Sequence, residues 1–216
     1  MKKREYIKEW FLQWRKELYH HKYLILISLF IIFIAVCINY AAGIYVTYKA
    51  QVVDVPDLIL SHFGPYNLRF LFVYGWLLFF YMLILYPLVF KVRKFHIMLF
   101  QFSFLIIIRS FFIILTHLQT PIDAIPGSFP GFYNLLKFNN DMFFSGHVAV
   151  PFLGFLIFKE SKIKYFFLIG SIIMAITVLG MHQHYSIDVF AAFFIVYGSY
   201  KIGNYTLKKL KIIKLD

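Results

Sequence analysis

Apolar residues fill long runs of the chain, and short polar segments separate these runs. A helix needs about 20 apolar residues to cross the hydrocarbon core of a bilayer, which is roughly 30 Å thick. The runs predict six membrane spans, at residues 23–46, 68–90, 95–118, 142–158, 165–181 and 187–202. The pattern therefore indicates an all-α polytopic membrane protein.

Composition supports this interpretation. Of 216 residues, 61% are hydrophobic, 22% are aromatic and only 15% are charged, which exceeds what one soluble domain of this size can bury. The first apolar run is too long for a signal peptide and lacks a small-residue cleavage site. Cys37 is the only cysteine, which excludes an internal disulfide and a thiolate metal site.

Residues 1–21 have a different pattern. Lys and Arg are in excess there, and apolar residues recur at spacings of three and four, at Ile7, Trp10, Phe11, Trp14 and Leu18. Such spacing places them on one helical face. We expect an amphipathic helix that lies in the cytoplasmic headgroup region with its lysines towards anionic lipid. A partner-binding helix is the alternative. Residues 22–216 are expected to form a single membrane domain.

Positive charge is concentrated at the tails and at two short turns, near residues 91–94 and 159–164, which together hold 18 of the 22 Lys and Arg residues. The positive-inside rule then predicts two cytoplasmic termini, which agrees with an even number of spans. This placement explains the net charge of +12 without a nucleic-acid partner. The loops at residues 49–67 and 119–141 fall on the opposite, non-cytoplasmic face.

Residues 181–189 read Met-His-Gln-His-Tyr-Ser-Ile-Asp-Val and lie between the last two predicted spans. His184 and Asp188 are four residues apart, so they share one helical face. A carboxylate in this position can hold one imidazole nitrogen and make the other a better nucleophile or base. The alternative is an ordinary polar loop.

A second histidine, His147, follows Ser145 and Gly146 at the start of the fourth predicted span, on the same face. The amides at a helix start favour an anion, and Gly146 would let the backbone approach it closely. Arg109 lies within the third span, where its charge must face the bundle or a water-filled cavity and be paired there. It could form an ion pair with an outer aspartate, or it could clamp a phosphate.

These side chains suit phosphoryl transfer without a metal or another cofactor. One imidazole attacks phosphorus, the other protonates the leaving alkoxide, and fixed positive groups hold the phosphate oxygens. The two histidines, the aspartate and Arg109 should then converge on one cavity. A zinc site is the competing use of two His and one Asp. It is less favoured, because a carboxylate four residues after a His more often orients the ring.

Four segments, taken in order, resemble the sphingomyelin synthase-related branch of the lipid phosphatase superfamily. Residues 141–147, Asp-Met-Phe-Phe-Ser-Gly-His, resemble its Cys-Gly-Asp-x-x-Phe/Tyr-Ser-Gly-His element. Residues 184–189 resemble its His-Tyr-Ser/Thr-x-Asp-Val element, and residues 55–57 its Leu-Pro-Asp. Arg109 with Thr116 matches the Arg-and-Thr pattern of the third span. The likeness covers roughly residues 55–195.

The resemblance implies a role for each matching residue. His184 would be the nucleophile, Asp188 its support and His147 the acid/base. The substrate-binding residues would be Arg109, Ser145, Gly146, Asp141, Tyr185 and Asp57. The chain departs from the pattern at Asn139-Asn140, which replace Cys-Gly, and at Val178, where ordinary lipid phosphatases carry an arginine.

The implied activity is transfer of a phospho-head group from a phospholipid donor to a lipid alcohol of the ceramide type, through a phosphohistidine. A lipid phosphatase with water as acceptor would use the same residues. A non-catalytic scaffold or transporter is the third hypothesis. The expected location is the plasma membrane in a bacterium, and otherwise a Golgi or endoplasmic reticulum membrane. The sequence leaves self-association open.

Overall fold

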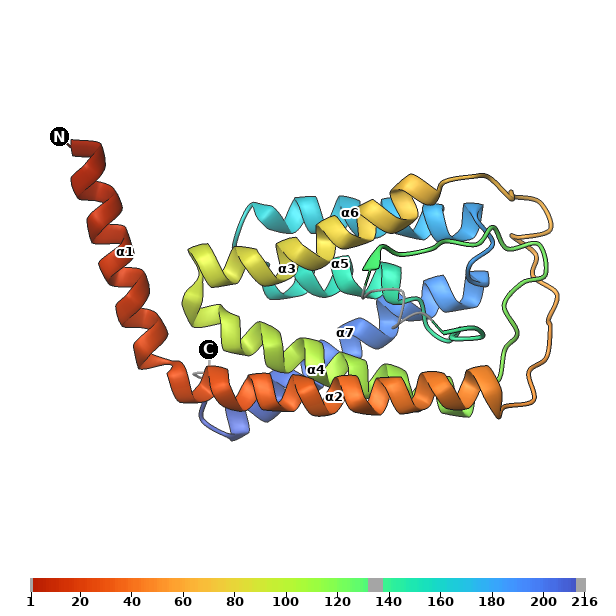
Figure 1. Ribbon diagram of the computed structural model, residues 1–216, viewed down its shortest axis with the longest axis horizontal. Helices are drawn as coiled ribbons and strands as arrows, with labels where there is room; N and C mark the ends of the chain where they lie inside the picture. Colours follow the sequence, from red (N-terminus) through yellow and green to blue (C-terminus); the bar gives the residue numbers. More distant parts are fainter. Residues whose placement is uncertain (1, 132–137, 213–216) are drawn as a thin grey trace.

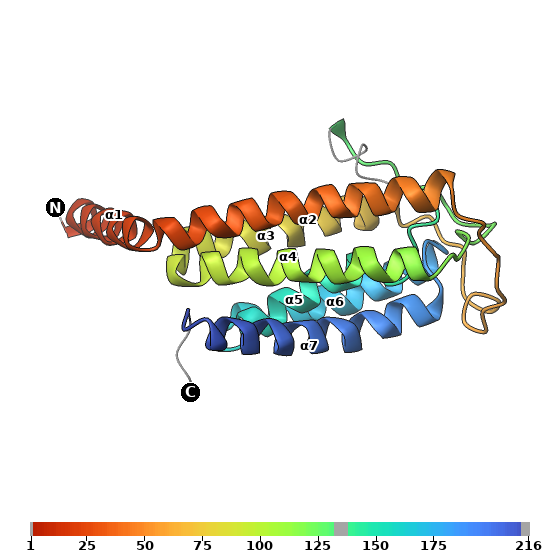
Figure 2. The same ribbon diagram turned by 90° about the horizontal axis from the view of Figure 1, so that it is seen from below.

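The computed structural model describes residues 2–131 and 138–212 as a bundle of helices. These are, in chain order, α1 (Lys2–His20), α2 (Lys22–Tyr48), the π-helical η1 (Leu71–Gly75), α3 (Trp76–Phe90), α4 (Val92–Leu115), α5 (Gly146–Ile157), α6 (Ile163–Gly180) and α7 (Ser186–Lys209). Helices α2 to α7 run beside one another along the long axis of the molecule (Figures 1 and 2). The predicted all-helical architecture is confirmed, and no β-sheet occurs in the described ranges.

Four of the described helices are long and apolar enough to cross a bilayer: α2, the continuous η1–α3 helix, α4 and α6. The chain is therefore a multi-pass membrane protein. The other two predicted spans differ. With 12 residues α5 is too short, since its length of about 18 Å falls below the bilayer core. Helix α7 has 24 residues but carries several polar side chains towards its C-terminal end.

At the candidate site, two helix ends differ from the predicted span ends. Helix α4 stops at Leu115, and the extended chain beyond it pairs with the loop after α2, where Val53 N–H donates to the His117 carbonyl (3.0 Å). Residues 142–145 are not helical, because the carbonyls of Asp141 and Phe144 accept hydrogen bonds from Arg109 instead of from a following helical turn.

Helix α5 lies at the centre of the bundle, in contact with α3, α6 and α7. Most of its side chains are buried. Gly154 permits the close approach of α6, because a Cβ at this position would lie 2.5 Å from the Phe167 ring. The helix that begins at Gly146 and His147 is thus held in a fixed position by its neighbours.

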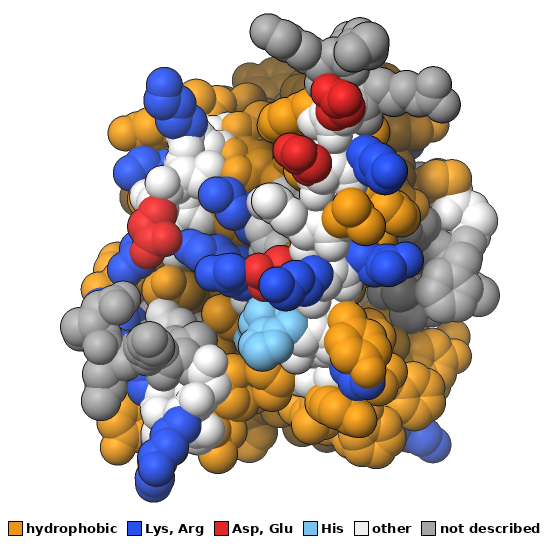
Figure 3. Space-filling model, turned by 90° about the vertical axis from the view of Figure 1, so that its left-hand side faces the viewer, with side chains coloured by type: hydrophobic (Ala, Val, Ile, Leu, Met, Phe, Trp, Pro, Cys, Tyr) orange, Lys and Arg blue, Asp and Glu red, His pale blue; other side chains and the backbone are white. Residues whose placement is uncertain are grey.

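Helix α1 projects away from the bundle, across the bundle axis (Figure 1). Its contacts come from its last turns: Trp14 Nε1 donates to the Leu88 carbonyl (2.8 Å), and the Glu17 carboxylate accepts two bonds from Arg93 (2.6 and 2.9 Å). The hydrogen bond from Arg93 lowers the pKa of Glu17. Lys and Arg side chains gather on this end of the molecule (Figure 3).

The loops at the other end are tied to the start of α7. The Asp57 carboxylate accepts from the backbone N–H groups of Ser186 (2.7 Å), Ile59 (2.8 Å) and Leu60 (3.1 Å). Burial acts to raise the pKa of Asp57, but these hydrogen bonds outweigh it, and the pKa lies below its usual value of 3.8. Asp57 therefore fixes its own loop and the first turn of α7 together.

Replacing Asp57 with asparagine should destabilise the end of the bundle at which these loops lie. We expect Asp57→Asn to reduce the free energy of unfolding by about 1–2 kcal/mol at pH 7, because the Ser186 N–H loses a charged acceptor. Thermal unfolding of the purified protein in detergent provides the measurement. Glu9→Gln, which changes an exposed carboxylate on α1, is the control and should have no effect.

The same variant has an expected pH dependence. A lowered pKa means that the Asp57 carboxylate stabilises the fold fully above pH 3.8, and that this stabilisation disappears as the pH falls through the lowered pKa. The difference between wild type and Asp57→Asn should shrink as the pH falls below 3.8. An equal difference at pH 7 and at strongly acidic pH would contradict this role.

Candidate active site

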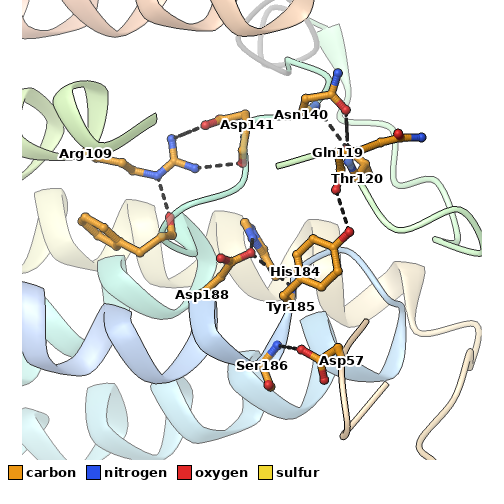
Figure 4. Close-up of polar contacts among 11 residues, drawn as sticks. Asp57, Arg109, Gln119, Thr120, Asn140, Asp141, His184, Tyr185, Ser186 and Asp188 are labelled. Atoms are coloured by element: carbon orange, nitrogen blue, oxygen red, sulfur yellow. Dashed lines mark hydrogen bonds and ion pairs between the residues drawn. The ribbon is translucent and has the colours of Figure 1, made fainter. Parts of the chain in front are cut away.

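His184 and Asp188 form a buried pair at the start of α7 (Figure 4). One oxygen of Asp188, Oδ2, lies 3.2 Å from His184 Nδ1 and accepts a hydrogen bond from Tyr185 N–H (3.1 Å). The side chain therefore caps α7 and orients the imidazole at once. Because Nδ1 faces the carboxylate, Nε2 is the ring nitrogen left for chemistry.

The start of α5 is joined to this pair through the backbone. Ser145 has an extended conformation (φ −63°, ψ 114°) directly before α5, and its N–H donates to the Asp188 carbonyl (3.2 Å). This hydrogen bond fixes the start of α5 against the start of α7, although the two segments are about 40 residues apart in the sequence. The Ser145 side chain is fully buried at this junction.

Arg109 reaches from α4 to the extended segment before α5 (Figure 4). Its Nε donates to the Phe144 carbonyl (2.9 Å), Nη1 lies 2.9 and 3.0 Å from the two Asp141 carboxylate oxygens, and Nη2 donates to the Asp141 carbonyl (3.4 Å). Of the two interpretations drawn from the sequence, the ion pair with an outer aspartate is therefore present. This ion pair holds the guanidinium in place and neutralises its charge.

His147 lies among aromatic rings that the sequence did not single out. Phe72 stacks on its imidazole (centroids 4.0 Å apart, planes at 24°), and Trp76 and Phe129 lie 5.8 and 5.9 Å away. These rings come from η1, α3 and the loop after α4. No spacing pattern joins three such segments, so only the fold could reveal this enclosure.

A cavity of about 750 Å³ brings the candidate residues together. Its polar lining includes His147, His184, Arg109 and Asp141, with Gly146 between them. Its remaining walls are largely apolar and reach the middle of the membrane helices through Ile32 and Val36 of α2, Phe80 of α3, and Phe102, Leu105 and Ile106 of α4. The cavity is therefore polar at the end that holds the two histidines and apolar in its depth.

The other predicted substrate-binding residues lie outside this lining. Asp57 and Ser145 make the backbone contacts described above, and Tyr185 is buried, with its hydroxyl 2.8 Å from Asp54 Oδ1 and 3.0 Å from the Gln119 carbonyl. Burial, together with the hydrogen bond to Asp54, raises the pKa of Tyr185 to about 12, so it remains a neutral donor. These contacts stabilise the segments that carry the site, but they do not face the cavity.

A third histidine forms a pair that sequence reasoning missed. His182 is buried, with Nδ1 2.7 Å from Asp123 Oδ2 and Nε2 2.7 Å from the Phe63 carbonyl. The ring joins the two outer loops to the turn that carries His184. The His-x-His spacing of residues 182–184 was the available signal, but it does not identify the partner.

The contact between His184 and Asp188 also bears on metal binding. The Asp188 carboxylate faces one nitrogen of the His184 ring, which is the arrangement that orients an imidazole. Within residues 2–131 and 138–212, no three His, Cys, Asp or Glu side chains are grouped as a metal site requires.

The chain matches no model of a known protein family, and it matches no curated protein. The candidate site is therefore defined by its motifs and by its geometry.

Proposed function

We propose that the protein is a membrane phosphotransferase that moves a phospho-head group from a phospholipid to a lipid alcohol of the ceramide type. The observation that carries this proposal is the cavity in which His147, His184 and Arg109 meet below a polar rim and above an apolar interior. A lipid requires both halves, because its phosphate needs polar contacts and its chains need an apolar wall.

In the first half-reaction, His184 Nε2 attacks phosphorus and the bond from phosphorus to the glycerol oxygen breaks. His147 gives its proton to that oxygen, so diacylglycerol leaves as an alcohol. The head group remains on His184 as a phosphohistidine. Asp188 stabilises the positive charge that the ring acquires, through its contact with Nδ1.

In the second half-reaction, neutral His147 takes the proton of the acceptor hydroxyl. The acceptor oxygen attacks phosphorus, the bond between phosphorus and nitrogen breaks, and His184 returns to its neutral form. His147 ends protonated, ready for the next donor. Each histidine thus completes the cycle in its starting state.

The fixed charges of the lining favour a phosphodiester donor over a phosphomonoester. Asp141 already compensates Arg109, so the cavity holds no strong excess of positive charge. A phosphodiester carries one negative charge, whereas a phosphomonoester carries up to two at neutral pH. Moving the second charge into a site with apolar walls costs more free energy. This favours transfer over phosphatase activity.

The local backbone supports the resemblance on which the acceptor class rests. Asn140 stands where the family pattern has glycine and adopts φ 59°, in the left-handed region that Gly and Asn tolerate best. Its side chain accepts from Thr120 N–H (3.0 Å), and this contact holds the loop at the cavity rim. The replacement is thus compatible with the same turn.

We place both termini in the cytoplasm and the active site on the non-cytoplasmic face, with six spans. The basic residues at the end of the molecule in Figure 3 support this orientation. For α5, the extended segment before the helix would complete the crossing, with its backbone polar groups satisfied by Arg109 and by α7.

The direct test is to incubate the purified protein with head-group-labelled phospholipid, with and without ceramide. Labelled phosphoceramide that forms only with ceramide supports transfer. Release of a water-soluble labelled head group, whether or not ceramide is present, would instead establish hydrolysis. No product in either case would reject both transfer and hydrolysis of this phosphodiester, and the same incubation with a labelled lipid phosphomonoester tests the phosphatase alternative.

The nucleophile assignment predicts unequal losses for the two members of the pair. His184→Ala should abolish turnover, because the atom that takes up phosphorus is gone. Asp188→Asn keeps the ring but spoils its orientation, so we expect a loss of roughly 10²–10⁴-fold with measurable residual activity. Initial rates with labelled phospholipid provide the comparison. Wild-type activity in His184→Ala would reject the mechanism.

The acid role of His147 predicts a dependence on the leaving group. His147→Ala should be nearly inactive on a natural phospholipid, whose alkoxide needs a proton. A nitrophenyl phosphodiester leaves with little protonation, so it should partly rescue His147→Ala but not His184→Ala. Rescue of His184→Ala instead would mean that the roles of the two histidines are reversed.

Arg109 should tolerate no conservative replacement. Lysine keeps the charge, but its single nitrogen cannot reach the Phe144 carbonyl and the Asp141 carboxylate as the separate guanidinium nitrogens do. We expect Arg109→Lys to lower kcat/KM by roughly 10–100-fold. Lys201→Arg, on an exposed position of α7, is the control. Equal activity of Arg109→Lys and wild type would exclude a geometric role for the guanidinium fork.

A further inference from the structure

A second depression, of about 400 Å³, lies beside the cavity at the outer end of the η1–α3 helix. Its lining is Arg69, Phe70, Val73, Tyr74, Ser128, Phe129 and Pro130, which we name the outer groove. Most of these side chains are apolar, and Phe70 and Tyr74 are exposed, with their rings 5.2 Å apart. The groove therefore offers an aromatic surface at the level where a membrane helix emerges from the bilayer.

Arg69 gives the outer groove a positive charge where the chain has few. Outside the basic tails and turns, the sequence holds only Lys49, Arg69, Arg109 and Lys137 as Lys or Arg. Arg69 is exposed, and in the described part of the chain no acidic side chain forms a salt bridge with it, whereas Arg109 is paired with Asp141. A guanidinium in the headgroup region is suited to a lipid phosphate.

The outer groove and the cavity are separated by a thin wall. Phe129 lines both spaces, and Phe72 of η1 lines the cavity while its neighbour Val73 lines the groove. Successive side chains of a helix point in different directions, so this short segment contacts both spaces. Phe129 in turn lies 5.9 Å from His147.

We propose that the outer groove is a docking site for a membrane phospholipid, which binds with its phosphate on Arg69 and its chains along Phe70 and Tyr74. The Phe129 side chain then separates the bound lipid from the catalytic cavity. Displacement of Phe129 would bring the lipid head group to His147. This inference rests on the proposed function, since it names the place where that reaction collects a substrate.

The test measures binding without turnover, in His184→Ala protein embedded in phosphatidylcholine nanodiscs. A phosphatidylcholine with a photoreactive diazirine near its glycerol is added, and the cross-linked peptides are identified by mass spectrometry. We expect cross-links within residues 69–74 and 128–130. Adding Arg69→Gln should reduce their yield roughly tenfold, as expected for the loss of a charge-assisted contact.

Lys49→Gln is the matched control, because it removes another outer cation that does not line the outer groove. It should leave the cross-links unchanged, and Arg69→Lys should retain part of the yield. Glycerophosphocholine, which carries the phosphate without the chains, should compete poorly. If it competes as well as whole lipid, the groove is an anion site and the lipid assignment is overturned.

Equal cross-linking in Arg69→Gln and in its parent would also overturn the proposal. The cross-linking result does not depend on whether the protein transfers a head group. Arg69-dependent cross-links in a protein that transfers no head group would support the outer groove and reject only the proposed function. In an active protein, Arg69→Gln should raise KM for the donor while kcat changes little, because Arg69 contacts no reacting atom.

Discussion

The Asp188 carboxylate is the constraint on which the candidate site depends. It is fully buried, and one oxygen serves both the Tyr185 N–H and the His184 ring. The backbone carbonyl of Asp188 accepts a hydrogen bond from the Ser145 N–H at the start of α5. The end of a helix, the orientation of an imidazole and the position of a second helix are thus set by one residue. The site is organised by the same contacts that fold the outer end of the bundle.

Arg109 imposes a second constraint, which explains why α5 is short. Three of its N–H groups need acceptors inside the bundle, and two of the acceptors are backbone carbonyls of residues 141 and 144. A helix through this segment would turn those carbonyls to its own amides. Non-helical backbone is tolerated inside the bundle because Arg109 and α7 satisfy its polar groups. Asp141 and Met142 of this segment line the cavity beside His147.

The runs of apolar residues were sufficient for the membrane helices but not for their ends at the site. Leu115 and Gly146 bound α4 and α5 because of contacts with Val53 and Arg109, which lie far away in sequence. The His184–Asp188 contact followed from a local spacing of four residues. Its counterpart, His182 with Asp123, spans 59 residues and has no local signature. Likewise, Phe72 and Phe129 appear in the sequence as two among 28 phenylalanines.

The location of the cavity bears on how the proposed transfer reaction would exclude water. One wall is α2, which packs mainly on α4 and is otherwise largely exposed, as expected for a helix surrounded by lipid. Of its three cavity-lining residues, Ile32 and Val36 offer no side-chain hydrogen bonds to water. The third, Asn39, is polar and accepts from the Ser110 hydroxyl (3.4 Å). A phosphohistidine at this site would stand between a polar rim and an apolar interior. An acceptor alcohol carried on a lipid chain would fill that interior, and so displace the water that would otherwise compete for phosphorus.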